Sequence, residues 1–157
     1  MSKNAIELLK EDHKKLKALL TELTETTNRA EKKRRELLEK IEMEVLIHAR
    51  IEEEIFYPAF KDAGNSEFSK LYFEALEEHR TVEKMVLPDL KKTPPTSDQF
   101  SGRAKVLKEL IEHHADEEEQ DMFKKAAKSL SKEELVALGE QMSERKLALQ
   151  REMSRAA

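Results

Sequence analysis

The chain has 157 residues, the size of one ordinary domain; 39% of them are charged and 38% are hydrophobic. With only 3 Gly and 4 Pro, it has too few turn residues for a β-sandwich or barrel, so long amphipathic helices are expected. The absence of Cys excludes disulfides, thiolate catalysis and Cys-ligated metals, and a net charge of −4 provides no general basic field for nucleic acid. No apolar run suits a signal peptide or a membrane span, so we expect a soluble, cytoplasmic protein without a nucleic-acid or membrane partner.

The first half of the chain predicts two helices. Asn4 is a helix cap, and apolar residues recur at helical spacing from Ile6 to Leu23. Asn28 is expected to cap the second helix, whose last turns Pro58 should disturb and which Gly64 should end.

The second half predicts three more helices. Asn65 or Ser66 begins the third, Pro88 should kink or end it, and a loop follows over 92–96. Ser97 or Asp98 caps the fourth helix. Ser131 and Glu134 form a capping box for a shorter fifth helix, and the tail from Arg151 is expected to fray.

Four long helices joined by short loops predict an all-α, up-down-up-down four-helix bundle. We expect residues 1–128 to form this bundle and residues 129–157 to form a C-terminal helical extension packed on its outside. The second and fourth helices are weak copies of one another.

Histidines lie on the apolar faces of all four bundle helices. His13, His48, His79 and His114 each fall three, four or seven residues from core-facing apolar positions. Glu52 and Glu118 follow His48 and His114 by four residues, so they stay near the same face. His113 falls about 100° away from His114, at the edge of the stripe, which leaves His113 and Glu117 as an alternative pair in place of His114 and Glu118.

These side chains are expected at one level of the bundle. With a rise of about 1.5 Å per residue, all lie about 15–20 Å from the same end. A single such histidine is usually an ordinary core residue, and runs such as Glu52-Glu53-Glu54 are mostly solvated, with one member at most pointing inward. Six unpartnered buried polar groups would cost about 1–3 kcal/mol each, close to the whole stability of a domain. A metal site is therefore the favoured interpretation.

Four imidazoles and two carboxylates without sulfur favour iron, manganese or zinc. Six ligands exceed the need of one tetrahedral zinc ion. They suit two ions, each held by two histidines, with the carboxylates bridging them.

The ordered pattern of a lone His, His-x-x-x-Glu, a lone His and a second His-x-x-x-Glu resembles the hemerythrin-like HHE cation-binding family. The matching stretches span about residues 3–127, namely Glu11-Asp12-His13, His48 to Glu53 with Phe56-Tyr57-Pro58, His79, and His114 to Glu119 with Met122-Phe123. The resemblance implies a four-helix bundle around two iron ions in a non-haem di-iron centre. Its metal ligands would be His13, His48, Glu52, His79, His114 and Glu118.

The resemblance also implies a ligand class. Members of the family bind or respond to oxygen or nitric oxide, decompose peroxide, or help repair iron–sulfur centres. The oxygen-carrying hemerythrins use five histidines, whereas the third helix here offers His79 with Glu83 one turn later, which puts reversible oxygen carriage in doubt. We therefore expect a di-iron protein that binds a small diatomic or peroxide ligand, and the alternatives are a di-iron enzyme consuming peroxide or nitric oxide, a helper of iron–sulfur repair, or a metal-free structural bundle.

Three further residues have open roles. Tyr57 or Tyr72 could donate a hydrogen bond to a bound ligand or simply fill the bundle with its hydroxyl at the rim. Glu83 could be a seventh ligand or a nearby acceptor. The metal in the cell, any redox partner and the oligomeric state do not follow from the sequence.

Overall fold

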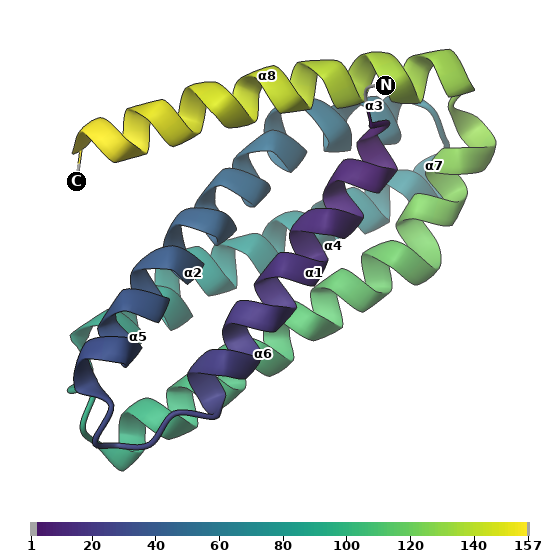
Figure 1. Ribbon diagram of the computed structural model, residues 1–157. Helices are drawn as coiled ribbons and strands as arrows, with labels where there is room; N and C mark the ends of the chain where they lie inside the picture. The colour runs from purple at the N-terminus through teal and green to yellow at the C-terminus, as the bar shows by residue number, and fades with distance from the viewer. Residues whose placement is uncertain (1–2, 157) are drawn as a thin grey trace.

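Residues 3–156 are described in a computed structural model, and almost all of them are helical (Figure 1). The helical segments in chain order are α1 (Ala5–Thr24), α2 (Glu31–Ile51), η1 (Glu52–Phe56), α3 (Tyr57–Asp62), α4 (Ser66–Thr81), η2 (Val82–Val86), α5 (Leu87–Lys92), α6 (Asp98–Glu117), η3 (Glu118–Met122), α7 (Phe123–Ser129) and α8 (Lys132–Ala156). The η segments are single stretches of π-helix that continue the α-helices on either side without a break.

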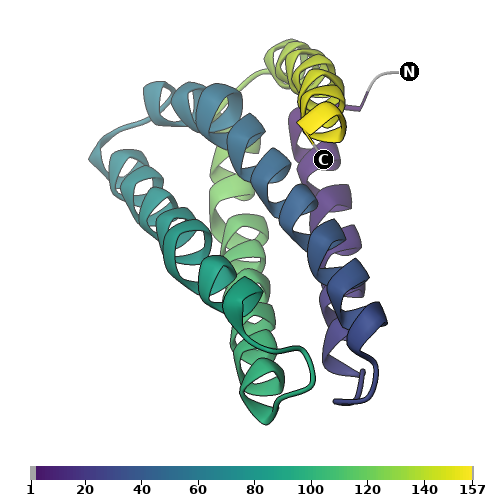
Figure 2. The ribbon, with the colours of Figure 1, turned by 90° about the vertical axis from the view of Figure 1, so that its left-hand side faces the viewer.

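Four long rods form the bundle. They are α1, then α2-η1-α3, then α4-η2-α5, then α6-η3-α7, and successive rods run in opposite directions (Figures 1 and 2). Helix α8 lies across one end of the bundle, where it contacts α1, α2 and η1. The fold is all-α, as predicted, and no helix among the described residues is long and apolar enough to cross a membrane.

Most predicted caps are present. The Asn4 and Asn65 side chains accept from the backbone N–H of Glu7 and Glu67, and Ser97 Oγ accepts from the N–H of Phe100. At the start of α8, the Ser131 Oγ accepts from the Glu134 N–H while the Glu134 carboxylate accepts from the Ser131 N–H. These bonds satisfy amides that the first helical turn leaves unpaired.

One predicted cap is wrong, and a second residue lies at its predicted helix end in a different conformation. Asn28 does not cap α2, whose N-cap is Ala30; the Asn28 amide instead donates to Asp98 at 2.8 Å. Gly64 does not adopt the left-handed conformation of a C-cap glycine. Its small size matters for a different reason, because a Cβ there would lie 2.2 Å from the Phe68 ring.

The C-terminal helix also differs from expectation. Helix α8 is 25 residues long and continues to Ala156 instead of fraying from Arg151. Leu135, Gly139, Met142 and Leu149 form its buried stripe, so most of its length is held by tertiary contacts.

Pro58 and Pro88 lie inside continuous rods and do not end them. Each follows a π-helical segment, in which the N–H of Tyr57 bonds to the carbonyl of Glu52 five residues earlier, and that of Leu87 to Val82. A proline has no N–H to donate within a helix, so a local change of hydrogen-bond register near it is expected.

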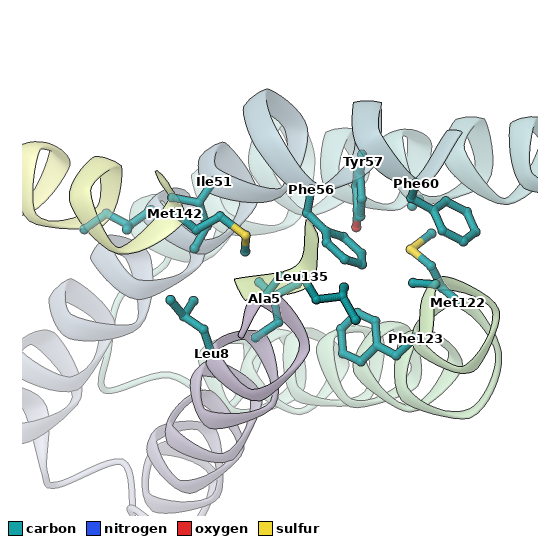
Figure 3. Packing of buried hydrophobic residues seen from close by; sticks show 14 of the residues in the cluster. Ala5, Leu8, Ile51, Phe56, Tyr57, Phe60, Met122, Phe123, Leu135 and Met142 are labelled. Carbon is teal, nitrogen blue, oxygen red and sulfur yellow. The ribbon is translucent and has the colours of Figure 1, made fainter. Parts of the chain in front are cut away.

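The hydrophobic core has two parts. The part near α8 joins residues of all four rods and α8 (Figure 3) and includes Ala5, Leu8, Phe56, Tyr57, Phe60, Phe123, Leu135 and Met142. The other part fills the end with the α1–α2 and α5–α6 loops and includes Leu20, Leu23, Ile41, Leu87, Leu90, Phe100 and Leu107. Six of the buried polar side chains come from the middle of the rods, between these two parts, namely Asp12, His13, His48, Glu52, His79 and Glu118.

Helix α8 approaches the start of α1 so closely that Gly139 has no room for a side chain. A Cβ there would lie 2.3 Å from the Lys3 carbonyl oxygen and 2.9 Å from the Ala5 nitrogen, both backbone atoms. We expect Gly139→Ala to lower the free energy of unfolding by about 2 kcal/mol, since overpacking costs about 1–3 kcal/mol. Urea denaturation measures this change.

Gly102→Ala is the matched control. Gly102 lies inside α6, and a Cβ added there would have no neighbouring atom within 4 Å. Alanine should therefore raise the free energy of unfolding by about 0.5–1 kcal/mol through its higher helix propensity. If both variants are equally stabilised, the close approach of α8 to α1 is refuted.

Candidate metal centre

The six side chains singled out from the sequence converge in the middle of the bundle. One set, whose ligand atoms all lie within 4.8 Å of one another, joins α1, α2, η1 and η3; a second set joins η1, α4 and α6. The first set is His13, His48, Glu52 and Glu118, and the second is Glu52, His79 and His114. Glu52 belongs to both sets and is fully buried.

The two carboxylates lie between pairs of histidines. Glu52 Oε1 is 3.1 Å from His48 Nε2 and 3.2 Å from His79 Nε2. Glu118 Oε1 is 3.0 Å from His13 Nε2 and 3.4 Å from the Nε2 atom of His114. Each carboxylate therefore spans the His13/His48 half of the cluster and the His79/His114 half.

Every one of the four imidazoles is oriented by an outer carboxylate. Because a carboxylate only accepts, the Nδ1–H group of each ring donates outward and directs Nε2 into the shared space. The donor–acceptor distances are 2.7–2.9 Å, for His13 to Glu119, His48 to Asp12, His79 to Glu53 and His114 to Glu78.

The two halves of the cluster repeat in sequence and in space. Each residue of one half has its counterpart 66 positions later, in the pairs Asp12 and Glu78, His13 and His79, His48 and His114, Glu52 and Glu118, and Glu53 and Glu119. The hydrogen bonds repeat as well. The residue before each lone histidine accepts from the motif histidine of the same half: Asp12 accepts from His48, and Glu78 accepts from His114. The residue after each His-x-x-x-Glu motif accepts from the lone histidine of the other half: Glu53 accepts from His79, and Glu119 accepts from His13.

As expected, only one member of each glutamate run points inward, but a second member also takes part in the site. Glu52 and Glu118 point into the cluster, and Glu53 and Glu119 reach the outer nitrogens of histidines on neighbouring rods. Glu53 and Glu119 remain about one-third exposed, so they combine solvent contact with a positioning role.

The π-helical segments bring two aromatic rings into the cluster. Residues five apart lie about 140° apart around an α-helix, but the wider π turn places them on one side. Tyr57 Oη is consequently 3.2 Å from Glu52 Oε1, and it donates to Glu118 Oε2 at 2.5 Å. Phe123, five residues after Glu118, stacks on the His13 ring with centroids 5.8 Å apart.

The structure places Tyr57 at the site, because its fully buried hydroxyl lies in the cluster and not at the rim of the bundle. Tyr72 packs its ring edge-to-face against Tyr57 and fills the bundle. Glu83 is half-buried and lies outside both sets of ligand atoms. His113 is exposed and pairs with Glu117 at 3.0 Å. His114, and not His113, therefore belongs to the central cluster.

Burial and opposite charge compete in setting the protonation of the cluster. Burial lowers the pKa of His48, but the charge of Glu52 and the hydrogen bond to Asp12 outweigh it and raise the pKa to about 10. The same balance raises the pKa of His79 to about 9 and holds that of Glu52 well below its usual value. Burial, with the charges of Glu118 and Glu52, raises the pKa of Tyr57, so its hydroxyl stays protonated.

The donor set fits a pair of cations. His48 Nε2 and Glu52 Oε2 are buried without a hydrogen-bond partner among the described residues, and an unpaired buried polar atom costs about 1–3 kcal/mol. Both residues contribute a ligand atom to the set whose atoms lie within 4.8 Å of one another. Cations bound there would pair them and would offset the burial of two carboxylates.

Two cavities reach the cluster. One, of about 130 Å³, is lined largely by apolar side chains such as Leu16, Val45, Val82 and Ile111, with His48, His79 and His114. The other lies between α4 and α6 and is lined by acidic residues together with His114. Glu78 and His114 line both cavities.

Comparisons with known proteins agree with this geometry. Residues 4–126 match the family model described as the hemerythrin HHE cation binding domain. A protein of Mycobacterium tuberculosis strain H37Rv, named "Uncharacterized protein Rv2633c", is 33% identical over 143 residues, which are 90% of this chain and 84% of that protein. A Nostoc protein named "DNA nickase" is 28% identical over 132 residues, but the match covers only 36% of its length.

A solved structure supports the same assignment. The crystal structure of a hemerythrin HHE cation binding domain-containing protein from Mycobacterium kansasii, an Rv2633c homologue, superposes with a TM-score of 0.81 at 34% identity. The match covers 94% of this chain and 87% of the other. The chain therefore belongs to the hemerythrin HHE cation-binding family.

Proposed function

We propose that this protein holds a non-haem di-iron centre that binds a small ligand such as oxygen, nitric oxide or peroxide. His13 and His48 would hold one ion, His79 and His114 the other, and Glu52 and Glu118 would bridge them. The observation that carries the proposal is the inward direction of all four Nε2 atoms around two shared carboxylates, each ring being oriented by an outer carboxylate. Iron in such a site supplies redox change and Lewis acidity.

The cavity beside the cluster supports the proposal that the ligand is small and uncharged. Its walls are mainly apolar, and it reaches three of the four histidines. Burial, together with the charge of Glu53, raises the pKa of the Glu83 carboxyl group on its lining. The cavity has room for a diatomic molecule or peroxide beside these histidines.

Tyr57 favours the second candidate, a di-iron enzyme that consumes peroxide or nitric oxide. Its hydroxyl is a proton donor held within 3.2 Å of Glu52 and His79. Cleavage of an O–O bond requires protons at the leaving oxygen, and a buried phenol that stays protonated is placed to orient such a ligand by a hydrogen bond.

The test is metal loading followed by turnover. Protein loaded anaerobically with ferrous iron should bind about two equivalents, and oxidation should give near-ultraviolet and visible charge-transfer bands. Uptake of no metal, or of a single ion, would refute the proposal.

Peroxide then separates the two candidates. A ligand-binding protein should consume about one equivalent of peroxide, whereas an enzyme should consume many. Tyr57→Phe, which retains the ring and removes only the hydroxyl, should slow an enzyme with little effect on iron stoichiometry.

A further inference from the structure

Helix α8 breaks the internal symmetry of the cluster. Asp12 and Glu78 are counterparts, each accepting a hydrogen bond from the histidine of a His-x-x-x-Glu motif. Lys146 of α8 donates to the second oxygen of Asp12, so both oxygens of that carboxylate are engaged. Among residues 3–156, no Lys or Arg side chain forms an ion pair with Glu78.

The two outer carboxylates also differ in their access to solvent. The Asp12 side chain is 4% exposed, because α8 passes over it, whereas that of Glu78 is 29% exposed. Glu78 and His114 line both cavities at the cluster, His48 and His79 line one of them, and His13 lines neither. Asp12 is thus enclosed by a charged contact with α8, whereas its counterpart Glu78 keeps partial access to solvent.

We propose that α8, through Lys146, makes the two halves of the metal site unequal. Lys146 is a positioning residue: it fixes Asp12, which fixes the ring of His48, so that an ion held by His13 and His48 leaves slowly. An ion held by His79 and His114 has no such clamp and is the labile, accessible one. This inference rests on the proposed metal centre, because without bound ions the two halves have nothing to release.

The contacts of Arg145 and Lys146 show why α8 acts on only one half of the cluster. Arg145, the residue before Lys146, also ties α8 to the bundle, by donating to Glu54 at 2.8 Å. Among residues 3–156, Glu54 forms no hydrogen bond or ion pair with a histidine of the cluster, so its ion pair with Arg145 docks α8 without reaching the histidines. Arg145 and Lys146 therefore separate docking of the helix from positioning of His48.

The test is release of iron from the two-ion protein to excess chelator, followed by absorbance. We expect two phases of equal amplitude in the wild type. Lys146→Met keeps an unbranched side chain and removes the charge. It should accelerate the slow phase about tenfold, because loss of a residue that orients a metal ligand lowers metal affinity by about 10–100-fold. Lys146→Arg should restore the slow phase, and Glu78→Gln should accelerate the fast phase alone.

Arg145→Met is the matched control and should leave both phases unchanged. If it accelerates release as much as Lys146→Met, the effect is general loosening of α8 and the proposal is overturned; release in one phase by the wild type overturns it as well. Equal melting temperatures of the metal-free Lys146→Met and Arg145→Met variants show that differences in release do not come from unfolding. If the wild type takes up no iron, the proposed function itself fails.

Discussion

Glu52→Ala should abolish binding of two metal ions. The Glu52 carboxylate is the one side chain shared by both sets of ligand atoms, and it lies between His48 and His79. Its removal would take a ligand from each of the two proposed ions at once. Because loss of an outer partner alone costs about 10–100-fold in metal affinity, we expect a loss of more than about 100-fold, measured as fewer than one equivalent of iron retained after gel filtration.

Glu117→Ala is the control for this experiment. Glu117 follows His113 by four residues, as Glu118 follows His114, but its side chain is 46% exposed. The variant should retain two equivalents. Retention of two ions at unchanged affinity by Glu52→Ala would contradict the assignment, and Glu52→Gln, which preserves the volume of the side chain, repeats the test if the alanine variant folds poorly.

Helical periodicity was enough to identify the six central side chains because each rod keeps its α-helical spacing up to its ligand. His13, His48, His79 and His114 lie in ordinary α-helix, where a spacing of three or four residues from an apolar position places a side chain on the buried face. Their common height follows from the antiparallel order of four rods of similar length. The proposal of iron comes from the family resemblance, because spacing alone leaves the metal open.

The same periodicity could not place Tyr57. It follows Glu52 by five residues, which in an α-helix would direct it about 140° away from the cluster. The π-helical segment removes that offset. Pro58 was a visible sign of a disturbance, but η3 has no proline beside it, so this sign is absent for Phe123.

The outer carboxylates were hidden by the acidic composition of the chain. Glu53 and Glu119 belong to runs of three glutamates, in which solvated side chains are the ordinary expectation. Their partners, His79 and His13, come from other rods, so the pairing depends on how the rods are placed beside one another. The glutamate after each His-x-x-x-Glu motif accepts a hydrogen bond from the lone histidine of the other half, and this exchange can be recognised only in the folded structure.

The length and position of α8 depend on contacts across the chain. Lys146 meets Asp12, 134 positions earlier, and Gly139 meets the backbone of Lys3 and Ala5. Local propensity in a segment rich in charged residues predicts a frayed end, and tertiary packing overrides it. A lysine on such a helix is ordinarily a solvated residue, and only the folded chain shows that Lys146 reaches a carboxylate bound to His48.

Metal loading should stabilise the protein strongly, and the gain should grow with pH. Iron in thousandfold excess over its dissociation constant stabilises a folded protein by about 4 kcal/mol per ion. Two ions should therefore raise the melting temperature by about 15–30 °C, at about 2–4 °C per kcal/mol for a chain of this size. Calorimetry of the metal-free and iron-loaded protein measures this shift, and Glu52→Ala should lose most of it.

The pH dependence follows from the protons that the metal must displace. In the metal-free protein, the raised pKa values of His48, about 10, and of His79, about 9, mean that these rings stabilise the fold fully below about pH 6.5 and that this stabilisation is lost as the pH rises through 9–10. The lowered pKa of Glu52 acts in the opposite sense, because its contribution is present above about pH 4.5 and is lost as the pH falls through its folded value.

Metal binds only the deprotonated imidazole, so loading near pH 7 should release protons into a weakly buffered solution. The gain in melting temperature should accordingly be larger at about pH 8 than at about pH 6, since each displaced proton weakens metal binding about tenfold per pH unit below the pKa of its ring. A gain that is equal at both pH values, without proton release, would show that the metal does not replace protons on these histidines and so is not bound by them.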